Sequence, residues 1–108
     1  MKPSERILGV EGGGTKTAWV LVESVARAPT PEFRILDQGK LPPSNLRLIT
    51  PERLREIFAK LPTKIDRVGV FLAGCGTEED RRLLKEICLG IWPTATIATG
   101  SDRQSGLA

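Results

Sequence analysis

The sequence predicts an α/β fold built on a mixed five-stranded sheet, with elements in the order β-β-β-α-β-α-β. The first forty residues contain short runs rich in β-branched and aromatic side chains, which glycine and proline separate. From residue 50 onward, two stretches carry apolar side chains at helical spacing. A short apolar run follows each stretch, and this alternation implies right-handed parallel crossovers.

The first half of the chain predicts three strands. Residues 6–11 form an apolar run that ends in a glycine cluster, and residues 16–23 form a second run. The glycines of residues 12–15 favour a hairpin between them, since glycine adopts positive φ freely. Residues 26–32 contain two prolines and predict a loop, and residues 33–38 predict the third strand.

The second half predicts two helices and two further strands. Thr50 is the N-cap of a helix that Pro62 stops, and Thr77 begins a second helix through a capping box. Residues 67–73 are almost continuously apolar, as in a strand buried on both faces, and residues 94–99 form the last strand. The two apolar helix stripes comprise Leu54, Ile57, Phe58 and Leu61, and Leu83, Leu84, Ile87, Cys88 and Ile91.

Length and composition indicate one soluble globular domain. The 108 residues are 40% apolar and 27% charged, and no apolar run approaches the roughly 18 residues of a membrane span. The chain has two cysteines outside any CxxC spacing and no histidine, which excludes disulfide scaffolds, most zinc sites and any histidine base. We therefore expect a reduced, cytoplasmic protein without a membrane partner.

The chain has only a small excess of basic over acidic residues. The net charge is +3, but the basic residues are scattered among acidic ones. The five aromatic residues do not alternate with basic stretches, as a stacking surface for nucleic acid requires. We therefore expect solvated helix faces and no nucleic-acid partner.

The sharpest motif is the run Gly12, Gly13 and Gly14, followed by Thr15. Three glycines cost more backbone entropy than a tight turn requires, and their N–H groups can close on an anion. The run is neither a Walker A loop nor a GxGxxG fingerprint, because Thr15 replaces the lysine and the motif opens a strand. The alternative is a glycine-rich hairpin without a ligand.

Three further side chains are candidates for the same chemistry. The Glu11 carboxylate directly precedes the glycines and would repel a phosphate unless a cation lay between them. This arrangement favours Mg²⁺ held partly through water. The alternative is that Glu11 is an incidental acid. Asp102 follows the last strand and is either a proton acceptor, a metal ligand or a helix N-cap. Asn45 can bind a sugar hydroxyl or can be a turn residue after prolines.

Together these segments resemble the N-terminal lobe of the BadF/BadG/BcrA/BcrD ATPase family, and within it the N-acetylglucosamine kinase-like branch. The first motif is fairly specific, and the others gain weight from their order along nearly the whole chain. Pro42 departs from the pattern, since members of the family often have glycine there. The matching motifs are residues 9–17, residues 43–45, residues 72–76, and residues 101–102 with 106–108.

The resemblance implies a ribonuclease H-like fold, as in actin-like ATPases and sugar kinases. It implies that Glu11 serves Mg²⁺, that Ser44 and Asn45 bind the sugar, and that Asp102 binds the acceptor hydroxyl and acts as general base. Positioning and charge stabilisation then supply most of the catalysis. The residues that the resemblance assigns to the ATP phosphates are Gly12, Gly13, Gly14, Thr15 and Lys16.

We therefore expect the N-terminal lobe of an ATP-dependent kinase for N-acetylglucosamine or a related amino sugar. A C-terminal lobe would supply the adenosine site, so the isolated chain is expected to be inactive, and a homodimer is left open. The first alternative is the family's ATPase activator of a dehydratase or reductase, which holds an iron–sulfur cluster through cysteines. The others are a ribonuclease H-like metal-dependent nuclease and a non-enzymatic lobe that packs on another chain.

Overall fold

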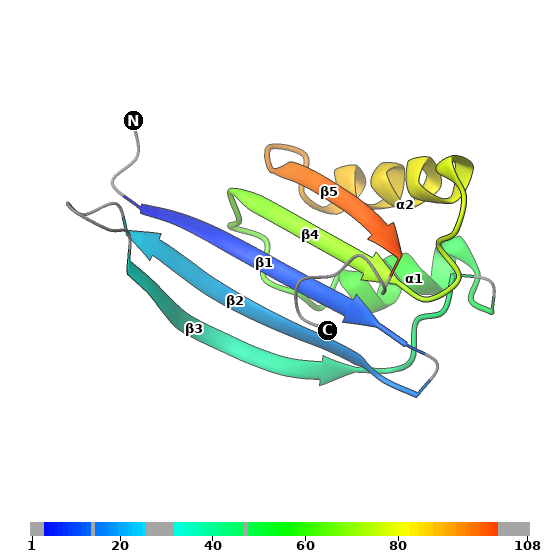
Figure 1. The fold of residues 1–108 in the computed structure, drawn as a ribbon, viewed down its shortest axis with the longest axis horizontal. Helices are drawn as coiled ribbons and strands as arrows, with labels where there is room; N and C mark the ends of the chain where they lie inside the picture. The colour runs from blue at the N-terminus through cyan, green and yellow to red at the C-terminus, as the bar shows by residue number, and fades with distance from the viewer. Residues whose placement is uncertain (1–3, 14, 26–31, 47, 102–108) are drawn as a thin grey trace.

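The computed structural model describes residues 4–13, 15–25, 32–46 and 48–101 (Figure 1). They form a mixed five-stranded sheet and two helices, which confirms the predicted α/β class and element order. The elements are β1 (Ser4–Gly12), β2 (Thr17–Val25), β3 (Glu32–Leu41), α1 (Pro51–Phe58), β4 (Arg67–Leu72), α2 (Glu78–Ile91) and β5 (Thr96–Ser101).

The strands lie in the order β3-β2-β1-β4-β5. β2 is antiparallel to both of its neighbours, whereas β4 is parallel to both β1 and β5. β1, β3, β4 and β5 therefore run in one direction and end at the same edge of the sheet, where β2 begins (Figure 1). We call this edge the carboxyl edge.

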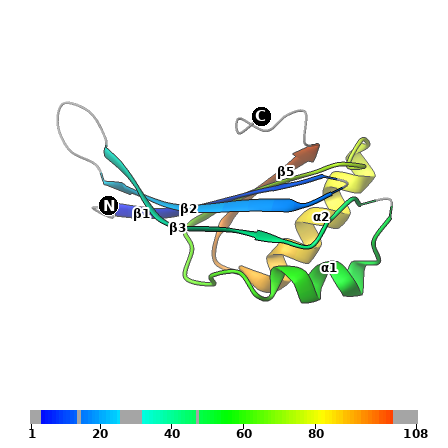
Figure 2. The same ribbon diagram turned by 90° about the horizontal axis from the view of Figure 1, so that it is seen from below.

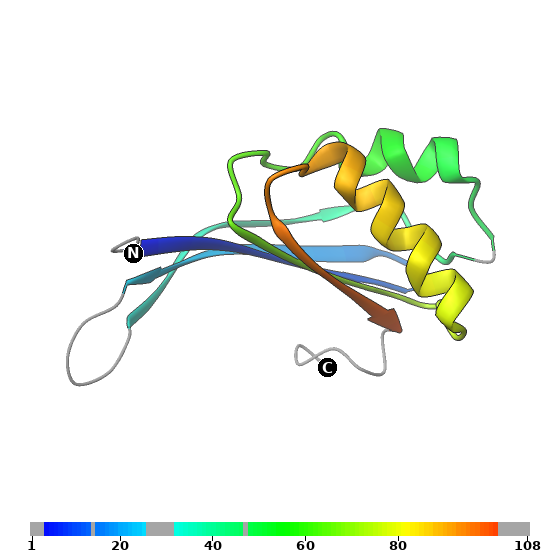
Figure 3. The ribbon, with the colours of Figure 1, turned by 90° about the horizontal axis from the view of Figure 1, so that it is seen from above.

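Both helices cover the same face of the sheet (Figures 2 and 3). Alternate residues of β1 and β4, such as Leu8, Val10 and Val70, point into the core that the helices close. The expectation that β4 is buried on both faces is wrong, because within the described residues no helix covers the other face and Phe71 stays half-buried there. Neither helix of this part of the chain is long and apolar enough to cross a membrane.

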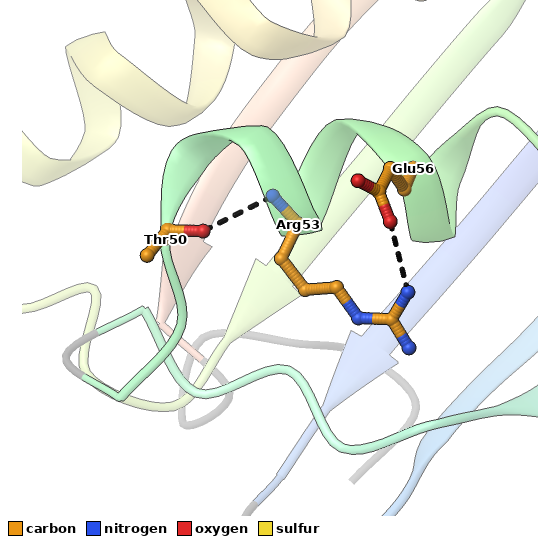
Figure 4. A network of polar contacts seen from close by, with 3 residues as sticks. All are labelled: Thr50, Arg53 and Glu56. Carbon is orange, nitrogen blue, oxygen red and sulfur yellow. Dashed lines mark hydrogen bonds and ion pairs between the residues drawn. The ribbon is translucent and has the colours of Figure 1, made fainter.

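The helix starts follow their predicted caps. The Thr50 hydroxyl accepts a hydrogen bond of 3.2 Å from the Arg53 N–H, and the Arg53 guanidinium lies 3.0 Å from the Glu56 carboxylate (Figure 4). The capping box at Thr77 and Asp80 is complete, with both reciprocal bonds present. These local bonds satisfy N–H groups that the first helical turn leaves unpaired.

Every strand and helix α1 differ from the predicted bounds at one end or both, and two of these differences have a clear cause. Helix α1 ends at Phe58, because the next turn tightens to bonds such as Leu61 N–H to Phe58 C=O, yet Leu61 remains buried. β3 continues past Gly39 to Leu41. Gly39 does not end the strand, because it lies opposite Trp19 on β2, where a Cβ atom would come within 2.9 Å of the indole nitrogen.

The ends of the two helices pack together through an aromatic pair. The rings of Phe58 and Trp92 lie 6.1 Å apart, and the Trp92 indole N–H donates to the Pro62 carbonyl at 2.7 Å. Cys88 is fully buried nearby in sequence on α2, and burial raises the pKa of its thiol to about 12. Cys88 is therefore a core residue, as its helical spacing predicted.

Candidate functional site

Three loops meet at the carboxyl edge. They are the turn between β1 and β2, the loop of residues 42–46 after β3, and the turn after β4. The Ala73 N–H donates to the Gly12 carbonyl, and the Leu46 N–H donates to the Ala73 carbonyl, each at 2.8 Å. A continuous chain of backbone hydrogen bonds therefore joins all three loops.

The turn after β4 depends on Gly74. Its φ of 84° is the one positive value among the described residues, and the Cys75 N–H closes the turn on the Leu72 carbonyl at 3.3 Å. This is the position of a type II turn that favours glycine. The motif of residues 72–76 thus has a structural role, because it brings the Ala73 backbone to the other two loops.

A buried pair of hydroxyl groups reinforces this junction. Thr17 and Ser44 are both fully buried, and their hydroxyl oxygens lie 2.5 Å apart. Thr17 also lies 2.8 Å from the Pro42 carbonyl, which can only accept. The single proton of Thr17 is therefore donated to Pro42, and Ser44 donates to Thr17. No motif in the sequence signals this anchoring role of Thr17.

Gly12 is required by close packing. A Cβ atom on Gly12 would lie 2.1 Å from Ser44 Oγ and 2.6 Å from Leu72 Cδ2. Any larger residue would therefore push the loop of residues 42–46 away from the sheet. The predicted reason for this glycine, a positive φ in the hairpin, is wrong, because its φ is not positive.

The turn itself presents polar side chains to solvent. The Gly13 N–H donates to the Lys16 carbonyl at 2.9 Å, so this N–H is already used and is not free for an anion. Thr15 and Lys16 are exposed, whereas Gly14 lies outside the described residues. The Thr15 hydroxyl and the Lys16 ammonium of this turn can donate to a phosphate.

A pocket of about 180 Å³ lies beside this turn. Glu11 is half-buried in it, at the end of β1 and across from Ala18 of β2. A Mg²⁺ ion fits such a place, because it keeps several waters and takes one or two carboxylates. The residues described contain no group of three or more His, Cys, Asp or Glu that could hold a metal. The pocket is lined by Glu11, Gly12, Gly13, Thr15, Lys16 and Ala18.

The predicted sugar-binding residues differ in access. Asn45 is half-buried, and its carbonyl accepts a hydrogen bond of 2.9 Å from the Leu48 N–H. Ser44 is buried against Thr17, so it holds the loop in place and offers no hydroxyl to a ligand at the surface. Pro42 takes part in the same anchor through its carbonyl.

The predicted base, Asp102, lies outside the described residues, as do residues 106–108 of the last motif. Ser101, the residue before it, ends β5 opposite Leu72 at the carboxyl edge. A scan against known protein families and a search of curated proteins find no match to this chain.

Proposed function

We propose that this chain is the N-terminal lobe of an ATP-dependent sugar kinase of the BadF/BadG/BcrA/BcrD ATPase type, with a ribonuclease H-like fold. The observation that carries the proposal is the junction of the glycine turn with the Asn45 loop at the carboxyl edge. The strand order β3-β2-β1-β4-β5 of this mixed α/β sheet is compatible with such a fold. Ligands of α/β sheets gather at this edge, where the parallel strands end.

The glycine turn is the phosphate side of the proposed site. The exposed Thr15 hydroxyl and Lys16 ammonium would donate to the phosphate oxygens of ATP, and the Glu11 carboxylate, which lines the same pocket, would hold Mg²⁺ partly through water. A bound Mg²⁺ would neutralise charge on those phosphates. Gly12 acts indirectly, since its lack of a side chain lets the sugar loop lie against the turn.

The loop of residues 42–46 is the sugar side. The Asn45 amide carries two donors and one acceptor, which suit the hydroxyl or acetamido groups of N-acetylglucosamine or a related amino sugar. Ser44 fixes the position of Asn45 through its bond to Thr17. A shift of about 1 Å at such a positioning loop can cost about 100-fold in rate.

Asp102 is the proposed general base. The acceptor hydroxyl oxygen attacks the γ-phosphorus, the bond to the β–γ bridging oxygen breaks, and ADP leaves. The Asp102 carboxylate receives the proton that the acceptor hydroxyl loses. The base orients the nucleophile, while positioning and electrostatics lower most of the barrier.

The two cysteines of this chain are poor candidates to hold the iron–sulfur cluster of an activator. Such a cluster is held by thiolates. Cys75 and Cys88 are the only cysteines of the chain, and both are buried. Burial raises the pKa of Cys88 to about 12, which opposes thiolate formation.

The proposal is tested by an assay of ADP release with the protein that is encoded by the reading frame containing this chain. With MgATP we expect release that depends on N-acetylglucosamine, and Asn45→Ala raises the KM for the sugar about tenfold while the KM for ATP stays unchanged. Glu86→Gln, on the exposed face of α2, is the control. Sugar-independent ADP release would indicate an ATPase, and no release would favour a non-enzymatic lobe.

A further inference from the structure

β3 is an outer strand of the sheet, and one of its sides has no neighbouring strand in the described part of the chain. Its residues 32–38 are all exposed. Phe33 and Ile35 keep 67% and 60% of their surface accessible. A long edge strand with exposed apolar side chains is a template for pairing with another strand.

The β2–β3 ribbon extends beyond the helices. Figures 2 and 3 show that α1 and α2 lie toward the carboxyl edge, whereas the far ends of β2 and β3 project past them. The described part of the chain measures 44 × 25 × 25 Å, in line with this projection. Phe33 and Ile35 therefore lie on a ribbon that the helices do not cover.

A β-bulge sets which side chains of β3 share a face. Ile35 pairs with Val22 and Asp37 with Leu21, which leaves Leu36 as the extra residue. The extra residue shifts the alternation, so Arg34 and Asp37 lie on the helix face of the sheet although they are three positions apart. Phe33 and Gln38 correspondingly lie on the open face.

We propose that β3 pairs antiparallel with β3 of a second copy of this chain, about a two-fold axis between Ile35 and Leu36. In this register Arg34 lies opposite the partner's Asp37, and Ile35 lies opposite the partner's Leu36. The symmetry repeats both pairs, so four apolar side chains meet at the axis and an opposite-charge pair flanks them on each side. The two sheets then form one continuous sheet.

Charge favours this register over two others. An axis through Arg34 would place two guanidinium groups opposite each other. An axis between Leu36 and Asp37 would place Arg34 opposite the partner's Gly39, with no ion pair. Arg34 already lies 2.6 Å from Glu23, but its side chain is 71% exposed, and a guanidinium has enough donors to bind a second carboxylate.

The expected association is reversible. Pairing of one strand edge buries less than the roughly 1,200 Å² at the low end of specific interfaces, which places it among weak, transient contacts. Because a two-fold contact closes on itself, it gives dimers and no fibres. Sedimentation velocity over a concentration series should therefore show a monomer–dimer equilibrium.

Two sets of variants test the interface. Ile35→Lys should weaken dimerisation at least tenfold, whereas Leu89→Lys, at an exposed position of α2, should leave it unchanged. Arg34→Asp and Asp37→Arg should each weaken it, and the two together should restore it. Circular dichroism checks that each variant is folded.

These measurements either support or overturn the proposed β3–β3 interface. Dimerisation that Ile35→Lys weakens and the double charge exchange restores supports it. A wild-type chain that stays monomeric up to a concentration of about 1 mM overturns it. A dimer that Ile35→Lys leaves intact places the interface elsewhere, and weakening by both single charge variants without rescue contradicts the register.

Discussion

The Ser44 hydroxyl donates to the hydroxyl of Thr17, and both side chains are fully buried at the carboxyl edge of the sheet. The two residues are 27 positions apart in the sequence. Thr17 is the first residue of β2, directly after the glycine turn, and Ser44 precedes Asn45. This bond therefore couples the proposed phosphate side of the site to its proposed sugar side.

Removal of the Thr17 hydroxyl should destabilise the fold. Thr17→Val leaves the Pro42 carbonyl and the Ser44 hydroxyl without this partner, which we expect to lower the free energy of unfolding by about 1–3 kcal/mol. Thr17→Ser keeps the hydroxyl and is the matched control. Urea unfolding of Thr17→Val, Ser44→Ala and the double variant should give non-additive losses, and strict additivity would contradict the coupling.

Gly12 and Gly13 should respond differently to the same substitution. Gly12→Ala places a methyl group against Ser44 and Leu72, and overpacking of this kind costs about 1–3 kcal/mol. For Gly13→Ala, whose nearest neighbour would be 3.8 Å away, we expect a change below about 0.5 kcal/mol. Thermal unfolding measures both, and equal losses would refute the packing role of Gly12.

Cys88 should make the fold sensitive to alkaline pH. Its pKa is about 12 in the folded chain against 9.0 for an ordinary thiol, so above pH 9 the unfolded chain loses the proton first. The free energy of unfolding then falls by up to about 1.4 kcal/mol per pH unit until the folded thiol also ionises. Below pH 9 both states are protonated and this effect is absent.

Cys88→Ala should remove this dependence. We would compare the free energies of unfolding at about pH 8 and about pH 10 for the wild type and the variant. The alanine lowers stability at both pH values, because it leaves a cavity, so the readout is the change with pH. Equal pH dependence of the two proteins would show that Cys88 does not titrate as its burial requires.

Lys16 should contribute to phosphate binding. Lys16→Met is expected to weaken MgATP binding about tenfold, since a charge-assisted hydrogen bond contributes about 1.5–3 kcal/mol. Lys64→Met, which removes a lysine beside Ile65 in the loop before β4, is the control for net charge. Calorimetric titration with MgATP measures both affinities. An equal loss of affinity in the two variants would show that Lys16 acts only through the net charge of the chain.

Local features of the fold were predictable from the sequence. The caps at Thr50 and Thr77 use side chains within three residues of the helix start, so the sequence alone is enough to recognise their motifs. Contacts across the sheet were not. The close approach of Trp19 to Gly39, and of Ser44 to Gly12, depends on which strands and loops become neighbours.

The candidate site shows the same division. The sequence motifs identified Glu11, Thr15 and Lys16, which the structure brings to one pocket. They did not distinguish the buried Ser44 from the half-buried Asn45, because the two are adjacent and both polar. The anchoring role of Thr17 was missed for a related reason, since a threonine that opens a strand after glycines carries no local signal of a partner 27 residues away.

In the proposed function, the glycine turn and the Asn45 loop hold the two reactants of one phosphoryl transfer. The sharpest test is phosphorus NMR of a reaction mixture. The mixture contains MgATP, N-acetylglucosamine and the protein encoded by the reading frame that includes this chain. We expect a new phosphomonoester signal from the sugar together with ADP, and loss of at least about 99% of the rate in Asp102→Asn. Release of inorganic phosphate with the sugar unchanged, or an unaltered rate in Asp102→Asn, would contradict it.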